Sequence, residues 1–116
     1  MKVPISIYAE MTPNPMAMKF VCNALIIEGN DVFEFEDAAS TEGAPLAKVL
    51  FTFPFVNTVM IAQNFVTITI VPNLEWDEVV MEVRDYLTNY LQAGQPVINE
   101  NEKPKSFVTK KEETEE

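Results

Sequence analysis

The chain has 116 residues, of which 47% are hydrophobic and 22% are charged, a composition typical of a single globular domain. Its 18 acidic and 8 basic side chains give a formal net charge of −10, which makes nucleic acids and anionic membranes poor electrostatic partners. The chain has no histidine, and its one cysteine is Cys22. These counts exclude a Cys/His zinc site, a histidine general base and an intramolecular disulfide.

The hydrophobic segments predict a cytoplasmic protein with no membrane partner. The longest of them are interrupted by Asn57, Gln63 and Asn64, so they are shorter than the roughly 20 apolar residues that span a bilayer. The first residues have too short an apolar run for a secretory signal. A single thiol also fits a reducing compartment.

The distribution of charge and apolar residues predicts a domain over residues 1–98 and a charged, flexible tail over residues 99–116. The tail has only Phe107 and Val108 as large apolar residues, and it ends in lysines and glutamates. Such a composition does not offset the entropy lost on ordering. The alternative for this segment is a docking role in which Phe107 and Val108 are the anchors.

The first half of the domain predicts two strands around a proline-rich corner. Apolar and polar residues alternate from Ile5 to Met11, which is typical of a half-buried strand. The run Thr12-Pro13-Asn14-Pro15 ends it, because proline removes a backbone donor and restricts the residue before it. A second strand, from Met18 to Leu25, follows closely enough to pair with the first in antiparallel fashion. Val32 to Phe35 predicts a short third strand.

The second half predicts a helix, a hairpin and a longer helix. Pro45 suits a first helical position, and the apolar spacing after it predicts a short helix that ends near Pro54. Two strands rich in Val, Ile, Thr and Phe follow, from Val56 to Ile61 and from Phe65 to Val71. From Trp76 onward, apolar residues recur on one helical face until Gly94 and Pro96 end the pattern.

The order of these elements predicts the fold class. Hairpins replace regular alternation of strand and helix, so we expect an α+β fold with two helices packed on one face of a small, largely antiparallel sheet.

Few residues in the chain are suited to catalysis or metal binding. Three interpretations of Cys22 are open. It is a buried strand residue, a nucleophile that lacks its usual base, or a ligand in a metal or cluster site that a second chain completes. The acidic residues from Asp31 to Asp37 also have three interpretations. They form a solvated edge of the sheet, they bind a hard cation, or they are the catalytic carboxylates of a hydrolase or transferase that has no positioned base. We therefore expect no enzyme, no catalytic residue, no metal site and no cofactor.

Lys19 stands out because bases are rare in this chain. It follows the proline corner on a predicted strand, where its ammonium suits either a protein-recognition surface or the role of keeping an edge strand soluble.

The corner also carries a family resemblance. The run from Glu10 to Phe20 resembles the NifU/Nfu N-terminal domain family, whose hallmark is Thr-Pro-Asn-Pro, three residues, then Lys-Phe. The resemblance covers roughly residues 5–92 and continues in register at four further places: Pro45-Leu46-Ala47, Leu50-Phe51, Phe65-Val66-Thr67-Ile68-Thr69 and Trp76.

The resemblance implies an α+β domain and a role in iron–sulfur cluster assembly or delivery. Full-length members of the family carry a second domain whose Cys-x-x-Cys thiolates hold the cluster. One cysteine per chain does not supply the thiolates that a cluster needs. The resemblance therefore implies a non-enzymatic accessory or protein-interaction module rather than a complete cluster scaffold.

The partner-binding residues implied by the matched corner are Thr12, Pro13, Asn14, Pro15, Lys19 and Phe20. The expected partner is a protein, either a separate Cys-x-x-Cys cluster-carrying chain or an apoprotein client, and the oligomeric state is left open. Two alternatives remain. One is a stand-alone structural or regulatory domain of the same fold without an iron–sulfur role, and the other is an inter-chain metal or cluster carrier that uses Cys22.

Overall fold

A computed structural model of the chain describes residues 4–99. The elements in chain order are β1 (Ile7–Met11), β2 (Ala17–Cys22), β3 (Phe33–Phe35), the 3-10 helix η1 (Ala38–Ser40), α1 (Pro45–Leu50), β4 (Val56–Ala62), β5 (Phe65–Ile70) and α2 (Trp76–Gln92). The strands form one five-stranded sheet in the order β1-β2-β5-β4-β3.

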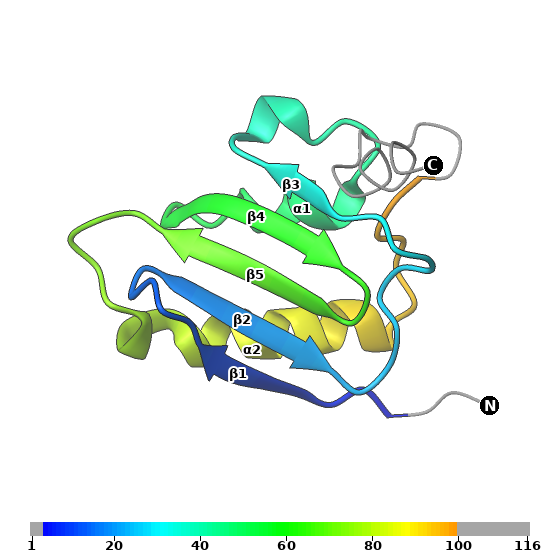
Figure 1. Cartoon of the computed structure of the whole chain (residues 1–116), viewed down its shortest axis with the longest axis horizontal. Helices are drawn as coiled ribbons and strands as arrows, with labels where there is room; N and C mark the ends of the chain where they lie inside the picture. The colour runs from blue at the N-terminus through cyan, green and yellow to red at the C-terminus, as the bar shows by residue number, and fades with distance from the viewer. Residues whose placement is uncertain (1–3, 100–116) are drawn as a thin grey trace, which may run out of the picture.

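All neighbouring strands in the sheet are antiparallel (Figure 1). The two predicted hairpins are confirmed: Met11 of β1 faces Met18 of β2, and Ala62 of β4 faces Phe65 of β5. The β2–β5 pairing joins these hairpins, which brings the proline corner beside the end of β5.

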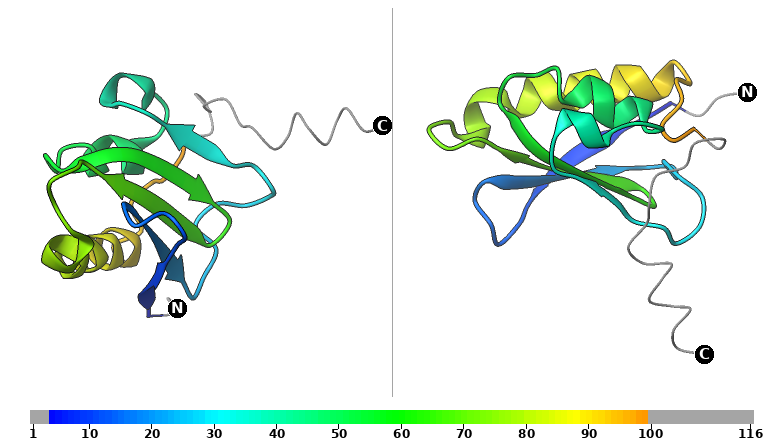
Figure 2. Two further views of the ribbon diagram at one scale, coloured as in Figure 1. Left: turned by 60° about the vertical axis from the view of Figure 1, so that its left-hand side comes forward. Right: turned by 90° about the horizontal axis from the view of Figure 1, so that it is seen from above.

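Both α-helices lie on one face of the sheet (Figure 2), as the sequence predicts. Strand alternation directs every second side chain to that face, where the core forms. The strand side chains that are less than 2% exposed are Phe20, Phe33, Val59, Ile61, Val66, Ile68 and Ile70. Helix α1 contributes Leu46 and Leu50, and helix α2 contributes Trp76, Val83 and Leu87.

No helix in the described part of the chain covers the opposite face of the sheet (Figure 2). Glu10, Lys19, Thr67, Met60 and Glu34 form one row across this face, as the strand registers show. This mixture of polar and apolar side chains is typical of a solvent-facing side of an antiparallel sheet.

The two predicted boundaries that differ most from the structure are the ends of α1 and β2. Helix α1 ends at Leu50 rather than near Pro54, because the chain tightens there into turns in which the Thr52 N–H donates to the Val49 carbonyl and the Phe53 N–H donates to the Leu50 carbonyl. Strand β2 ends at Cys22, and Leu25 lies in a loop with 67% of its surface exposed.

The ends of α2 follow its sequence signals. Glu75 and Glu78 form a capping box at the start, and after the last turn Gly94 adopts φ = 76°, a conformation that favours glycine. Within residues 4–99, neither α1 nor α2 is both long and apolar enough to cross a membrane.

Candidate functional site

The Thr12–Pro15 corner joins β1 to β2 and is held by its own polar groups. The Thr12 hydroxyl lies 2.9 Å from the Asn14 carbonyl oxygen and 3.2 Å from the Ala17 carbonyl oxygen. The Asn14 N–H donates back to the Thr12 Oγ1 at 3.1 Å, and the Asn14 Oδ1 accepts from the Met16 N–H at 2.9 Å. These bonds, with two prolines that fix their own φ angles, give a rigid corner.

The same corner is anchored to the start of α2. The Trp76 indole N–H donates to the Met16 carbonyl at 2.8 Å, and the Ile70 N–H of β5 donates to that carbonyl at 3.0 Å. The ring of Phe20 packs edge-on against Trp76, with 5.6 Å between the ring centroids. Residues far apart in the sequence therefore set the position of the corner.

Phe20 and Lys19 do not share a surface with the corner. Phe20 is 1% exposed and belongs to the core, so it supports the corner from beneath. Lys19 occupies the helix-free face of the sheet, where its Nζ lies 4.3 Å from the centroid of the Phe65 ring in a cation–π contact. Of the residues that the sequence assigned to partner binding, only Thr12, Pro13, Asn14 and Pro15 lie together.

A groove of about 800 Å³ runs beside the corner, between β1 and the start of α2. Its apolar lining includes Met11, Met16, Met18 and Leu74, and the side chain of Met11 is 82% exposed. Glu75, Asp77 and Glu78 supply the charged side chains of the lining. An exposed methionine in a groove is typical of an adaptable protein-binding surface, because its thioether chain repacks easily.

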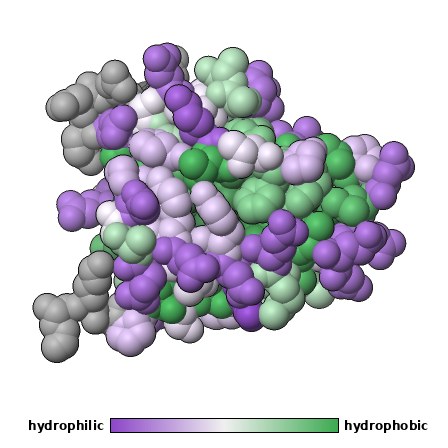
Figure 3. All heavy atoms as spheres, turned by 180° about the vertical axis from the view of Figure 1, so that it is seen from behind, coloured by the Kyte–Doolittle hydropathy of each residue, from purple (hydrophilic) through white to green (hydrophobic). Residues whose placement is uncertain are grey.

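Apolar residues gather on the helix-bearing face in Figure 3, most broadly towards the right of the view. That side is the left of Figure 1, where the corner meets the start of α2. A contiguous exposed apolar region of this kind marks an interaction surface more often than scattered single residues do.

Met11 and the start of α2 contribute to this site, although neither was among the predicted partner-binding residues. From the sequence, Met11 and the other methionines suit core filling by default, with soft-metal binding or an adaptable binding surface as the alternatives. Helical spacing from Trp76 onward predicted α2 but contained no information on which strand the helix would meet.

The other candidate residues form no site in the described part of the chain. Cys22 is buried, and its Sγ lies 3.7 Å from the Oδ1 of Asn23. In residues 4–99, no group of three or more His, Cys, Asp or Glu side chains is placed to hold a metal ion. Glu34 and Glu36 are exposed, as a solvated acidic edge requires.

Comparison with solved structures places the chain among small α+β domains with a NifU-like fold. A NifU-like protein from Saccharomyces cerevisiae superposes with a TM-score of 0.71 at 28% identity, covering 83% of this chain and 86% of that one. Protein SAV1430 from Staphylococcus aureus shares the fold at 16% identity and a TM-score of 0.59, covering 70% of this chain and 96% of that one.

The sequence comparison gives the family. The model of the scaffold protein Nfu/NifU N-terminal domain matches residues 7–94, and the chain belongs to this iron–sulfur cluster scaffold family. Proteins described as NFU1 iron–sulfur cluster scaffold homolog, mitochondrial, are 30% identical over 94 residues in Drosophila grimshawi and 28% identical over 95 residues in Drosophila ananassae. These alignments cover 81% and 82% of this chain but only 32% and 33% of the relatives, so the chain spans about a third of their length.

Proposed function

We propose that the chain is a non-enzymatic protein-interaction module in iron–sulfur cluster assembly or delivery. Its partner is a separate Cys-x-x-Cys cluster-carrying chain or an apoprotein client. Membership of the scaffold family supports the pathway. The buried state of the chain's only cysteine supports an accessory role, because a cluster is normally held by several accessible thiolates.

The groove beside the Thr12–Pro15 corner is the proposed contact surface, and the exposure of Met11 is the observation that carries it. A side chain that lines an apolar groove and is 82% exposed gains most of its burial energy from a partner. Full burial of a methionine contributes roughly 1.5–3 kcal/mol. The polar groups of the corner hold its shape, so the apolar side chains beside it are the surface available to a partner.

The proposal is tested by anaerobic affinity capture of the tagged chain from its own cells, with a matched pair of variants. Met11→Asp places a charge in the groove, and Met81→Asp makes the same change on α2 at a side chain that is 54% exposed. We expect the unchanged chain and Met81→Asp to recover either a Cys-x-x-Cys protein together with iron–sulfur absorption or an apoprotein that receives a cluster. Recovery by Met11→Asp should fall at least about tenfold.

Two results would contradict the proposal. Equal recovery by both variants would remove the groove as the contact surface. Recovery of a colourless chain alone would favour a structural or regulatory domain of the same fold. Circular dichroism of each variant shows whether it is folded.

The proposal includes the cytoplasmic location expected from the sequence, and fractionation of the same cells tests it.

A further inference from the structure

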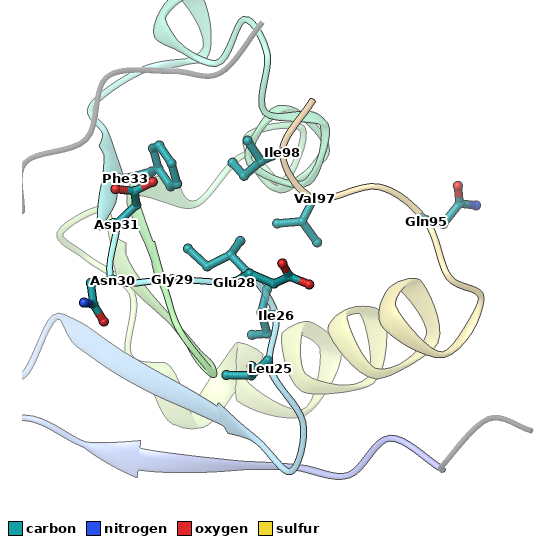
Figure 4. Close-up of a pocket in the computed structure, with 11 residues that line it drawn as sticks. Leu25, Ile26, Glu28, Gly29, Asn30, Asp31, Phe33, Gln95, Val97 and Ile98 are labelled. Atoms are coloured by element: carbon teal, nitrogen blue, oxygen red, sulfur yellow. The ribbon is translucent and has the colours of Figure 1, made fainter. Parts of the chain in front are cut away.

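A second cavity lies apart from the groove beside the Thr12–Pro15 corner, which we call the corner groove. The two cavities share no lining residue. The volume of the second cavity is about 980 Å³, within the range of protein ligand sites. It is bounded by the loop between β2 and β3 and by the segment that follows α2 (Figure 4). We call this cavity the distal cleft, defined by residues 25–31, Phe33, Gln95, Val97 and Ile98.

Backbone hydrogen bonds hold the loop wall of the distal cleft in place. The N–H groups of Ile26 and Ile27 donate to the Gln63 carbonyl at 2.6 and 3.2 Å. The Gln63 side chain donates to the Asn30 Oδ1 at 3.2 Å. This wall therefore depends on the β4–β5 hairpin, a part of the sheet that does not belong to the cleft.

The opposite wall is tied to α1 and to the end of α2. The Leu46 N–H donates to the Val97 carbonyl at 3.5 Å, and the Asn99 N–H donates to the Gly43 carbonyl at 2.8 Å. The Tyr90 hydroxyl donates to the Pro96 carbonyl at 2.7 Å. Burial, with a smaller contribution from Tyr86, raises the pKa of Tyr90 above its ordinary value of 10.0, which favours the protonated hydroxyl that donates this bond. Hydrogen bonds within the chain therefore hold both walls.

The lining of the distal cleft combines an aliphatic interior with negative charge. Ile27 and Phe33 are buried, Val97 and Ile98 are half-buried, and Leu25 is largely exposed. In Figure 4, Val97 and Ile98 point towards the loop that carries Glu28, whereas Gln95 points away. Glu28 and Asp31 are the charged residues of the lining, which contains no lysine or arginine.

We propose that the distal cleft binds an extended segment of a partner protein that carries a branched aliphatic side chain flanked by lysine or arginine. The aliphatic side chain matches the Ile, Val and Leu lining. The cations match the carboxylate of Glu28, in a lining without lysine or arginine and a chain whose net charge of −10 attracts basic partners. Apart from its own atoms and its chain neighbours, Gly29 at φ = 87° has no heavy atom within 4 Å of the position that a Cβ would take, so the space beside its Cα is open. This inference does not depend on the iron–sulfur role.

The test titrates the full chain, labelled with nitrogen-15, with the acetylated and amidated peptide Ser-Lys-Val-Leu-Lys-Ser. We expect amide shifts to concentrate in residues 25–31 and 95–98, and affinity to fall as salt screens the charges. A peptide with glutamate in place of lysine should not bind. Equal binding of both peptides, or shifts confined to other regions, would overturn the proposal. So would contacts in the free protein between residues 100–116 and Leu25 or Val97, because the chain itself would then fill the cleft.

Matched variants show which residues of the distal cleft contribute to peptide binding. Glu28→Lys should weaken peptide binding about fivefold at low salt, and Leu25→Ser about threefold. Glu82→Lys and Met81→Ser make the same changes at exposed positions on α2 and should stay within about twofold of the unchanged chain. Equal losses in the α2 variants would assign the effect to overall charge or hydrophobicity and would reject the distal cleft as the site.

Discussion

Neighbouring residues of the motif that matches the Nfu/NifU family have different structural roles. Asn14 and Thr12 use their side chains to shape the corner, Lys19 lies on the helix-free face, and Phe20 supports the corner from the core. Replacing Asn14 would therefore disturb the fold and the surface together. A substitution at Met11 tests the surface alone, because its side chain lines the groove and is mostly exposed.

Trp76 is the residue through which α2 holds the corner, and Trp76→Phe tests that link. The variant keeps an aromatic ring for the contact with Phe20 but loses the indole donor to the Met16 carbonyl. That carbonyl keeps its bond from the Ile70 N–H, so we expect a loss of only about 1 kcal/mol in the free energy of unfolding. Urea unfolding followed by circular dichroism measures it.

The corner should also loosen in Trp76→Phe. Faster hydrogen exchange at the Met16 and Ala17 amides than in the unchanged chain would show this, with exchange in β4 as the internal control. Unchanged stability together with unchanged exchange would mean that the indole bond does not hold the corner.

The loop between β5 and α2 brings the helix to the groove by means of one unusual backbone conformation. Asn73 has φ = 79°, a left-handed conformation that costs most residues roughly 1–2 kcal/mol and that asparagine and glycine tolerate. We expect Asn73→Ala to destabilise the chain and Asn73→Gly to be more stable than Asn73→Ala by up to about 1 kcal/mol. The difference is limited because glycine also raises the entropy of the unfolded chain.

Thermal and urea unfolding of the two Asn73 variants give the comparison. Pro72→Ala is a suitable companion, since it changes the same loop without changing the left-handed residue. If the alanine and glycine variants are equally stable, the left-handed conformation at Asn73 does not limit how α2 is placed.

Local patterns predicted the elements well, because strand alternation, helical spacing and proline breaks act within a few residues. The hairpins at Met11/Met18 and Ala62/Phe65 follow from short connections of this kind. The groove could not be predicted, because it depends on the contact between Trp76 and Met16, which are 60 positions apart. The placement of Lys19 and Phe20 on opposite faces of the sheet could have been predicted, because neighbouring residues of a strand point to opposite faces.

At the scale of the whole molecule, the corner groove and the distal cleft lie towards opposite ends of the sheet (Figure 1). The groove is built by the β1–β2 corner and the start of α2. The distal cleft is built by the β2–β3 loop and the segment after α2. The two proposed sites share no lining residue, so a segment bound at one does not occupy the other.

Separate sites predict independent variants, because substitutions that are distant and share no partner usually add within about 0.3–0.5 kcal/mol. Met11→Asp should reduce partner recovery yet leave peptide affinity at the distal cleft within about twofold. Glu28→Lys should weaken the peptide yet leave partner recovery intact, and the double variant should show both losses. Peptide affinity is then measured with and without the captured partner, to test whether binding at one site affects the other. A partner-dependent change of more than about fivefold would show that the two ends are energetically coupled, so that binding at one end alters affinity at the other.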